Sequence, residues 1–586
     1  MPQVPHLLLI MVALPFLGSI LAASVSRLGR NQVRTIALVN VLLSFLLSVV
    51  MAWHYDPFDH SATAKAKAAA AASADAKANV KAPVRPVFKS GAALIQMQTN
   101  LPWLGAKGGP DIRFHVGVDG ISLWLICLTN LLMIPAVLVS WNAISDRPAA
   151  FYSLLLLLQA GMVGVFSAQD LILFYLFFEF TLIPLFFLIG LWGGHDRRWA
   201  AQKFFVYTFA GSALTFLGLL FIVLSYSWMS GIPKLVFSIP ELTTKLPAVI
   251  AQTAENQAYW GRVSPWIFLA LFAGFAIKVP LFPFHTWLPL AHVEAPTAGS
   301  VLLAGVLLKI GSYGFLRFAL PLVPEACWGH FYIIGWLSTI GIIYGALLAL
   351  AQDDIKKLVA YSSVSHMGLC LLGLFSLNIV GMTGGMLQMI NHGLSTGALF
   401  TIVGMLYERY HTRDIEAFGG LTRKLPIMAF FLVVTTFSSI GLPGLNGFPG
   451  EITSLMGMFR EDMLFGALGL TGIILGAWYM LSLVARTFFG RLREPVIDAH
   501  GHHAQGPHAH EAHPIHDLGF REIAALTPLV VMMVAIGLFP QFFIDRFDPS
   551  LRQIAQTLAE RRNRTVKNTA AAPDVTPVVA ASTTQK

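Results

Sequence analysis

Ionisable side chains lie inside long apolar stretches of the sequence. Glu179 lies in the middle of FYLFFEFTLIPLFFLIGLWG, Lys278 in FAGFAIKVPLFPFHTW and Lys309 in SVLLAGVLLKIGSYGF. A charge at the centre of a bilayer costs about 2.5–3.5 kcal/mol on insertion scales, so each of these residues is a functional hypothesis. Lysine suits proton exchange better than arginine, which stays protonated. These residues therefore indicate transfer of protons or cations inside a membrane.

Two histidines and a further glutamate extend this set. His366 lies in YSSVSHMGLCLL and His392 in QMINHGLSTGALF, and the charge of histidine changes near neutral pH. Glu451 follows in GLPGLNGFPGEITSLMGMF. We predict that these groups pass protons between them.

Prolines interrupt the helices next to two of the buried charges. Pro280 and Pro283 follow Lys278, and Pro443 precedes Glu451. Proline removes a backbone donor and breaks a helix. Irregular backbone at membrane depth is tolerated only where protein packs around it or a hydrated cavity adjoins it, so a broken helix beside a charge is typical of a transport site.

Each residue also has a structural interpretation. Glu179 and Lys278 could form a structural ion pair, although such a pair does not require a helix break. Lys309 could be a span-end lysine that snorkels to the interface. The histidines could each donate one hydrogen bond to a neighbouring helix, and Glu451 could be a carboxylate at the edge of a loop. His285, His292 and Glu294 are expected near the cytoplasmic mouth, as uptake or structural groups.

The composition excludes a water-soluble chain. Hydrophobic residues make up 56% of the 586 residues and charged residues 12%, against about 25% charged in soluble domains. The apolar residues form long runs instead of the alternation of a membrane barrel. We predict an all-α integral membrane protein with about 14 spans, centred near residues 14, 43, 128, 157, 180, 215, 275, 308, 340, 366, 392, 442, 475 and 533.

The interrupted spans suggest an internal repeat. The seventh and twelfth spans are both broken, which predicts two inverted five-helix repeats, spans 4–8 and 9–13, each containing a broken helix. The expected organisation is spans 1–2 in 1–53, an external loop in 54–114, span 3 in 115–147, the first repeat in 148–320, the second repeat in 328–490, a His-rich loop in 491–522, span 14 in 523–545 and a polar, disordered tail in 546–586.

Two segments resemble insertions. Residues 61–82 are an Ala/Lys-rich tract that could form a surface helix or stay disordered. Residues 500–516 hold seven histidines, which could capture a stray metal, but a solvated loop is favoured because nothing fixes the ligand geometry. We therefore predict no metal or cofactor site in this chain. The cysteines, at Cys127, Cys327 and Cys370, read as packing residues.

The distribution of basic residues predicts the orientation in the membrane. Lys and Arg gather in the short loops of one side, among them Arg27, Arg30, Arg197, Arg198, Lys356, Lys357, Arg423 and Lys424. The positive-inside rule makes that side cytoplasmic and places both termini in the periplasm. The net charge of +9 is dispersed and forms no basic stripe, so we expect no nucleic-acid partner.

Two long motifs resemble a known family. KVPLFPFHTWLPLAHVEAPTAGSVLLAGVLLKIGSYGFLR (278–317) and DIKKLVAYSSVSHMG (354–368) are similar to the core of the antiporter-like subunits of complex I, the respiratory NADH:quinone oxidoreductase, and of Mrp-type antiporters. Three features resemble the M branch (NuoM-type) more than the L or N branch. These are FHVGVDGISLWLICLTNLL, a glutamate at position 451, and the absence of the lateral helix that ends subunit L.

The resemblance implies a proton-translocating translocase subunit in the bacterial inner membrane, with subunits L and N as neighbours. It also implies that NADH, FMN, iron–sulfur clusters and quinone are bound by other subunits, and the sequence has no dinucleotide fingerprint or cysteine cluster. The family's Glu/Lys pair, central lysine, bridging histidines and exit residue correspond to Glu179 with Lys278, Lys309, His366 with His392, and Glu451. Two alternatives remain open, an Mrp-type Na⁺/H⁺ antiporter subunit and a membrane scaffold with structural charges.

Overall fold

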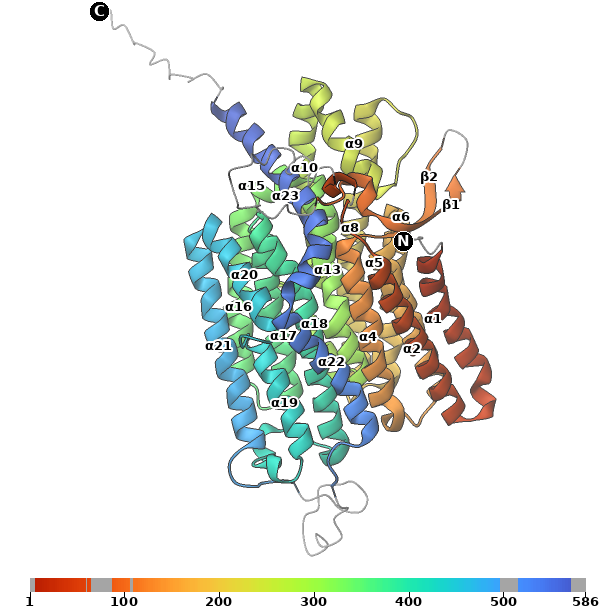
Figure 1. Cartoon of the computed structure of the whole chain (residues 1–586), viewed down its shortest axis with the longest axis vertical. Coiled ribbons are helices and arrows are strands. Elements are labelled where there is room, and N and C mark those ends of the chain that lie inside the picture. Colours follow the sequence, from red (N-terminus) through yellow and green to blue (C-terminus); the bar gives the residue numbers. More distant parts are fainter. Residues whose placement is uncertain (1–5, 60, 65–86, 106–108, 496–514, 571–586) are drawn as a thin grey trace, which may run out of the picture.

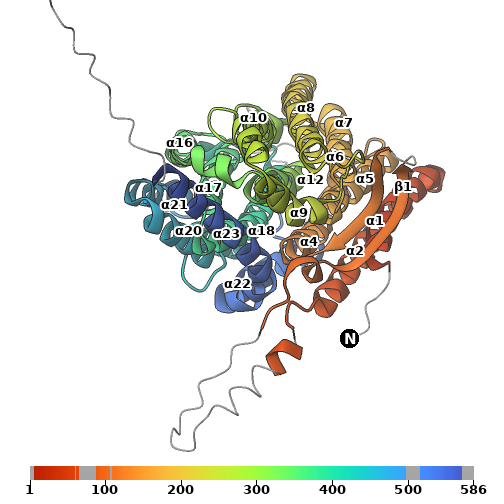
Figure 2. The ribbon, with the colours of Figure 1, turned by 90° about the horizontal axis from the view of Figure 1, so that it is seen from above.

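The computed structural model describes residues 6–59, 61–64, 87–105, 109–495 and 515–570. Most of the Ala/Lys-rich tract and most of the His-rich segment lie outside these residues. Figure 1 shows a bundle of long, roughly parallel helices, and Figure 2 shows that the first and second halves of the chain lie side by side. Within the described part, 13 helices are long and apolar enough to cross a membrane. The predicted class, a helical membrane protein, is confirmed.

The first helices form one flank of the bundle. They are α1 (Leu7–Ser24), the short turn η1 (Val25–Leu28), α2 (Arg30–His54) and α4 (Gly120–Ala143). Helices α1 and α2 expose large apolar side chains such as Leu17 and Leu46, whereas α4 is buried along nearly its whole length. The outer surface of α1 and α2 is therefore suited to lipid, and α4 belongs to the core.

A small sheet departs from the all-α prediction. After the turn η2 (Gly91–Leu94), strands β1 (Gln96–Gly105) and β2 (Asp111–Val118) pair antiparallel. They form a hairpin at the upper end of the bundle in Figure 1. These strands were not predicted because β1 lies in the predicted external loop and the end of β2 was assigned to the start of span 3, which begins only with α4.

The first repeat contains one helix more than predicted. Its elements are α5 (Pro148–Ser167), α6 (Leu171–Phe180), α7 (Leu182–Trp192), α8 (Arg197–Ser230), α9 (Ile239–Gln252), α10 (Ala254–Lys278), α11 (Trp287–Glu294), α12 (Thr297–Leu302), η3 (Leu303–Leu307), α13 (Leu308–Gly314), η4 (Phe315–Ala319) and α14 (Leu320–Leu322). The unexpected helix is α9, which lies at the upper end of the bundle (Figure 1) and starts at Ser238, whose hydroxyl accepts from the Glu241 N–H.

The second repeat explains why the described residues contain 13 long apolar helices and not the 14 predicted spans. Its elements are α15 (Pro324–Gly329), α16 (Phe331–Leu350), α17 (Ile355–Leu374), α18 (Ile379–Tyr410), η5 (Ile415–Ala417), η6 (Leu421–Arg423), α19 (Pro426–Ser439), α20 (Gly447–Glu461) and α21 (Met463–Phe488). The predicted run centred near residue 442 falls on the break between α19 and α20, so neither half reaches the length of a full span. The predicted twelfth span is therefore this interrupted helix, and it accounts for the difference between the 14 predicted spans and the 13 long helices of the described residues.

The two repeats start from opposite ends of the bundle. Strand β2 and helix α15 both lie at the upper end in Figure 1. Helix α4 descends from β2, so α5 ascends, whereas α16 descends directly from α15. This opposite direction is what an inverted repeat requires.

The C-terminal part differs from the prediction. Helix α22 (Phe520–Leu538) is followed by α23 (Pro540–Ala570), a helix that continues far into the predicted polar tail. The prediction of disorder is wrong for residues 546–570, and residues 571–586 lie outside the described part. The first described residues and the end of α23 lie at the same end of the bundle (Figure 1).

A buried stripe explains why α23 is ordered. Phe547, Leu551 and Leu558 are spaced for one helix face and are fully buried. The indoles of Trp124 and Trp328 donate hydrogen bonds to backbone carbonyls of α23, at 3.1 and 3.2 Å. Polar residues separate these apolar positions, so the segment contains no continuous apolar run and was not predicted as an ordered helix.

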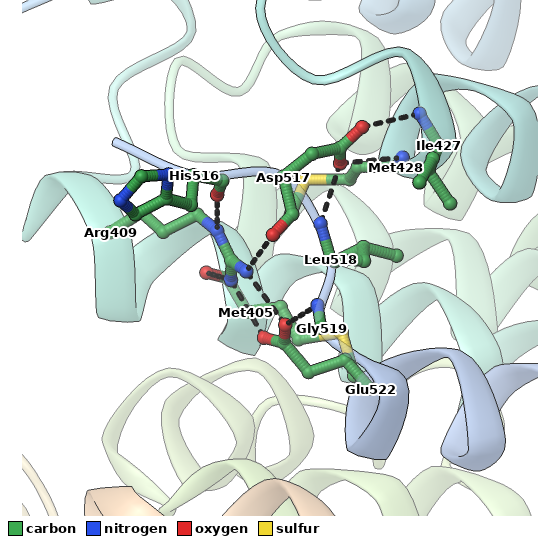
Figure 3. Close-up of polar contacts among 9 residues, drawn as sticks. All are labelled: Met405, Arg409, Ile427, Met428, His516, Asp517, Leu518, Gly519 and Glu522. Carbon is green, nitrogen blue, oxygen red and sulfur yellow. Dashed lines mark hydrogen bonds and ion pairs between the residues drawn. The ribbon is translucent and has the colours of Figure 1, made fainter. Parts of the chain in front are cut away.

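A polar cluster fixes the chain before α22 at the lower end (Figure 3). The Arg409 guanidinium of α18 makes two bonds of 2.7 Å with the Glu522 carboxylate. The Asp517 carboxylate accepts from the backbone N–H groups of Ile427 and Met428, at 2.6 and 3.1 Å, and so caps the start of α19. These contacts hold α18, α19 and α22 together below the second break.

Candidate proton-transfer site

The first helix break ends directly at a buried charge. Helix α10 stops at Lys278, because Pro280 and Pro283 supply no backbone N–H to continue it. The Trp287 indole donates to the Ile277 carbonyl at 2.9 Å and satisfies one acceptor that the break leaves open. The predicted interruption is therefore present and is stabilised by side-chain bonding.

Lys278 and Glu179 do not form a direct ion pair. The Lys278 side chain is 3% exposed, and its ammonium lies 4.7 Å from the centre of the Phe178 ring. In the described part of the chain no carboxylate oxygen lies within 4.0 Å of this ammonium, and Oε1 of Glu179 is buried without a hydrogen-bond partner. The two charges act on one another at longer range, so a structural ion pair is not what holds them there.

Lys309 lies between two π-helical stretches. These are η3 (Leu303–Leu307) and η4 (Phe315–Ala319), and π-helical turns inside α-helices are frequent at functional sites. The Lys309 ammonium donates to the Ala304 carbonyl within the first stretch. The side chain is wholly buried, as is the hydrophobic span that contains it. Snorkelling is therefore excluded for this lysine.

A chain of titratable groups leads away from Lys309. Its Nζ lies 2.6 Å from Nδ1 of His392, the His392 and His366 ring centres are 5.7 Å apart, and His366 Nδ1 lies 3.5 Å from Oε1 of Glu451. The ammonium donates to an unprotonated Nδ1, or a neutral amine accepts from a protonated one. Because both directions use one geometry, the contact suits proton exchange.

The second helix break lies beside the end of this chain. Between α19 and α20 the backbone turns through Gly441, at a positive φ of 72°, and Pro443. A side chain at Gly441 would collide with the Glu451 carboxylate, so glycine is needed there for close approach as well as for the turn. Glu451 is buried in the first turns of α20 and accepts from Gln388 Nε2 at 3.4 Å. It is not a loop-edge carboxylate.

A small cavity joins the last two members. It measures about 10 Å³ and is lined by His366, Ser439 and Glu451 among others. The Ser439 and Tyr479 hydroxyls each lie 3.4 Å from Nε2 of His366. A space of this size is at the lower limit for one water molecule. The cavity is therefore polar enough to support a proton step between His366 and Glu451.

The two lysines are coupled only through space and packing. Gly311, two residues after Lys309, packs so closely against Val279 and the Phe275 carbonyl that a side chain would not fit. No hydrogen bond between Lys278 and Lys309 is present in the described residues. The geometry thus gives one direct bond, from Lys309 to His392, and places His366 and Glu451 beyond it, whereas Lys278 is linked to Lys309 only through space and packing.

Comparison with known proteins assigns the family. The model described as NADH:quinone oxidoreductase/Mrp antiporter, TM matches residues 168–476. The NADH-quinone oxidoreductase subunit M of Rhodobacter capsulatus is 41% identical over 448 residues, covering 76% of this chain and 82% of that protein. That of Rickettsia bellii (strain RML369-C) is 39% identical over 467 residues, covering 80% and 87%. This chain belongs to the subunit M family of NADH:quinone oxidoreductases.

Solved structures agree with this assignment. A chain of respiratory complex I from Thermus thermophilus with bound NADH superposes with a TM-score of 0.74 at 29% identity, covering 94% of this chain and 99% of that one. A chain of the Mrp complex from Dietzia sp. DQ12-45-1b gives a TM-score of 0.71 at 18% identity, covering 96% and 98%. The second likeness shows the shared fold alone. The matched family region spans both broken helices and every predicted relay residue.

One buried ion pair of this subunit M chain was missed by the sequence analysis. Arg317, in η4, makes bonds of 2.8 and 2.7 Å to the carboxylate of Asp119, which caps α4. Arg317 also donates to the hydroxyls of Ser122 and Tyr313, both at 3.1 Å. An arginine inside an apolar run was the available signal, because such a charge needs a partner. The pair fixes the π-helical stretch that follows Lys309.

Removing the Asp119 carboxylate is expected to destabilise the chain by about 3–5 kcal/mol, because Asp119→Ala leaves the Arg317 charge buried without its partner. Burial acts to raise the pKa of Asp119, but the Arg317 guanidinium outweighs it and holds this pKa below its usual value. The stabilisation is therefore present above the usual carboxylate pKa and is lost as the pH falls through the lowered value. Thermal unfolding of the purified assembly measures both effects.

A matched control is Asp111→Ala, which removes a partly exposed ion pair of 2.8 Å with Lys234. Exposed pairs contribute about 0–1 kcal/mol, so this variant should unfold near the wild-type temperature. Equal destabilisation by the two substitutions would contradict the importance assigned to the Asp119–Arg317 pair.

Among the predicted uptake or structural groups, His292 is the most deeply buried. His292 is fully buried, its ring stacks on Phe400 at 4.5 Å, and neither ring nitrogen has a hydrogen-bond partner in the described part of the protein. Lys356 donates to the Ala295 carbonyl at 2.6 Å and to the Val293 carbonyl at 3.3 Å. No group of three or more metal-binding side chains occurs among the described residues.

Proposed function

We propose that this chain carries protons for a respiratory NADH:quinone oxidoreductase, complex I, along a path from Lys309 through His392 and His366 to Glu451. The observation that supports it is the sequence of close groups, with a direct 2.6 Å contact from Lys309 to His392 and a 3.5 Å contact from His366 to Glu451. Proton transfer needs partners within about 2.6–3.2 Å or one water apart. The first step meets this condition directly, and the small cavity supports the last. The middle step requires a bridging water or a ring movement, because the two histidine ring centres are 5.7 Å apart and Nε2 of His392 has no hydrogen-bond partner among the described residues.

The path is driven by charge near the first break. Lys278 and Glu179 make no direct bond, and the Lys278 ammonium lies over the Phe178 ring, so no contacting carboxylate among the described residues fixes the charge of Lys278. A change of charge at this pair alters the proton affinity of Lys309 through the packed interface at Gly311. Lys309 then passes its proton to His392. Broken helices on both sides of the path provide the irregular backbone that transport sites use.

The surroundings of the chain follow from its family. NADH, FMN, iron–sulfur clusters and quinone are bound by other subunits, and the antiporter-like subunits L and N are the neighbours in the membrane arm. The chain lies in the bacterial inner membrane with both termini in the periplasm, a placement supported by basic residues such as Arg198 and Lys357 in the short loops of the lower end. The Mrp-type antiporter alternative has less support, because that structural likeness rests on 18% identity.

Replacing Glu451 by glutamine tests the path at its far end. Glu451→Gln keeps the shape and the contact with Gln388 but cannot bind and release a proton. We expect NADH-driven proton pumping in inverted vesicles to fall about fivefold, the lower end of typical coupling effects, while the complex still assembles. The control Glu416→Gln removes an exposed carboxylate paired with Arg486 at 3.5 Å and should pump normally. Normal pumping by assembled Glu451→Gln complexes would exclude the proposed exit.

A further inference from the structure

An apolar groove opens on the flank of the bundle, away from the proton path. Its volume is about 480 Å³, within the range of small-molecule sites. It lies between α2, α4, α18, α22 and α23. Its walls include Phe45, Trp53, Trp124, Leu131, Ile390 and Phe543. The groove is therefore preformed and apolar, and helices far apart in the sequence make its walls.

The groove opens near the boundary between headgroups and hydrocarbon. Trp53 is the penultimate residue of α2, and Trp124 lies in the first turns of α4, so both lie near the upper ends of their helices. Trp53 is 76% exposed on the outer surface. Tryptophans concentrate at this depth of a bilayer because one edge is apolar and the other polar. A phospholipid beside the groove would place its phosphate at this level.

One positive charge lies at the mouth of the groove. The Arg546 guanidinium lies 3.8 Å from the centre of the Phe542 ring and donates to the Phe542 carbonyl at 2.6 Å. Its Nε is buried without a hydrogen-bond partner, and no carboxylate in the described residues lies within 4.0 Å of it. The neighbouring Asp545 carboxylate accepts instead from Gln541. The groove therefore combines apolar walls with a cation that no carboxylate of the described residues contacts.

We propose that this groove binds an anionic phospholipid, with an acyl chain along the apolar walls and the phosphate on Arg546. The walls alone select nothing, because lipid tails around the protein are equally apolar. Selectivity arises from the charge, since arginine binds phosphate through paired donors and is weakly hydrated. A second protein helix fits less well, because a helix about 10–12 Å wide would insert little more than one turn into this volume.

Photolabelling of the purified assembly tests the proposal. The probes are phosphatidylglycerol and phosphatidylcholine, each with a diazirine in one acyl chain, added to dioleoyl phosphatidylcholine vesicles. Labelled peptides of this chain are then identified by mass spectrometry. In the wild type, phosphatidylglycerol should label groove peptides about fivefold more than phosphatidylcholine, the preference expected for one basic residue near the membrane surface.

Three variants separate the effect of the Arg546 charge on lipid labelling from the effect of the groove's shape. Arg546→Gln should reduce the ratio to about one by removing the charge. Val49→Trp adds bulk to a groove-lining position and should reduce labelling by both probes while Arg546 remains. The control Arg552→Gln removes a partly exposed arginine paired with Asp548 and should keep the wild-type ratio.

Two results would overturn the proposal. Equal labelling by the two probes in the wild type would mean contact with bulk lipid only. No labelling of groove peptides in the assembled complex would mean that another protein subunit covers the groove. Both results come from the wild type, so they stand even where a variant fails to assemble.

Discussion

Proton pumping and quinone reduction are expected to fall together to about a tenth of wild type in Lys278→Ala complexes, because coupling between two sites typically changes affinity about 5–150-fold and this substitution removes it. Lys278 ends α10 at the break, is 3% exposed and has no carboxylate within 4.0 Å in the described residues. Its removal leaves Glu179 without the positive charge that acts on it at a distance. The link between the two halves of the path is then lost, which stops turnover.

The measurement is NADH-driven acidification of inverted membrane vesicles, with quinone reductase activity assayed in parallel and assembly checked on a native gel. The control Lys245→Ala removes an exposed lysine of α9 that pairs with Glu241 at 2.8 Å, and it should behave as wild type. Near-normal activity and pumping in assembled Lys278→Ala complexes would mean that the buried charges are structural. Loss of assembly alone would show a packing role, and Lys278→Met, which keeps the length of the side chain, resolves that case.

The helix breaks could be predicted because their cause is local. Pro280, Pro283 and Pro443 lack the N–H that a helix needs, and this holds whatever surrounds them. The charges beside the breaks stood out for a similar reason, since the cost of a mid-membrane charge depends on the residue and its apolar neighbours. Sequence alone was therefore sufficient to place Lys278 and Glu451 beside helix breaks, while their part in proton transfer stays a prediction.

The distances within the site could not be predicted, because they depend on packing between helices. Lys309 touches His392 directly, whereas Glu179 and Lys278 do not touch, although both pairs look alike in the sequence. The π-helical stretches around Lys309 have no signature in VLLAGVLLKIGSYGFLRFAL, which reads as an ordinary apolar run. Such stretches depend on the contacts of the whole fold.

The remaining differences from the prediction are the strands β1 and β2 and the helix α23, which lie outside the long apolar runs. Neither the strands β1 and β2 nor α23 contains an apolar run long enough to span a membrane, so the apolar pattern of the sequence did not indicate them. The order of α23 depends on contacts with distant partners, such as the Trp124 indole and the ion pair of 3.0 Å between Arg562 and Glu461. The stripe at Phe547 and Leu551 was visible, but its partner surface was not.

Lys309 has the most direct connection to the rest of the path. Its ammonium bonds to the Ala304 carbonyl and to Nδ1 of His392, and both acceptors are buried. A group placed in this way can act as a proton carrier or as a fixed positive charge. The two roles predict different behaviour for arginine, which keeps the charge but does not release its proton.

Lys309→Ala and Lys309→Arg are therefore both expected to lose proton pumping by about a hundredfold, the lower end of what positioned acid–base groups contribute. The control Ser312→Ala alters the same buried span one turn away, where the Ser312 hydroxyl accepts a weak hydrogen bond from the Cys370 thiol at 4.0 Å, and it should pump normally. The readout is again the NADH-driven pH gradient in vesicles with assembled complex. If Lys309→Arg pumps while Lys309→Ala does not, a fixed charge suffices, and protons must pass the centre of the chain without binding to this residue.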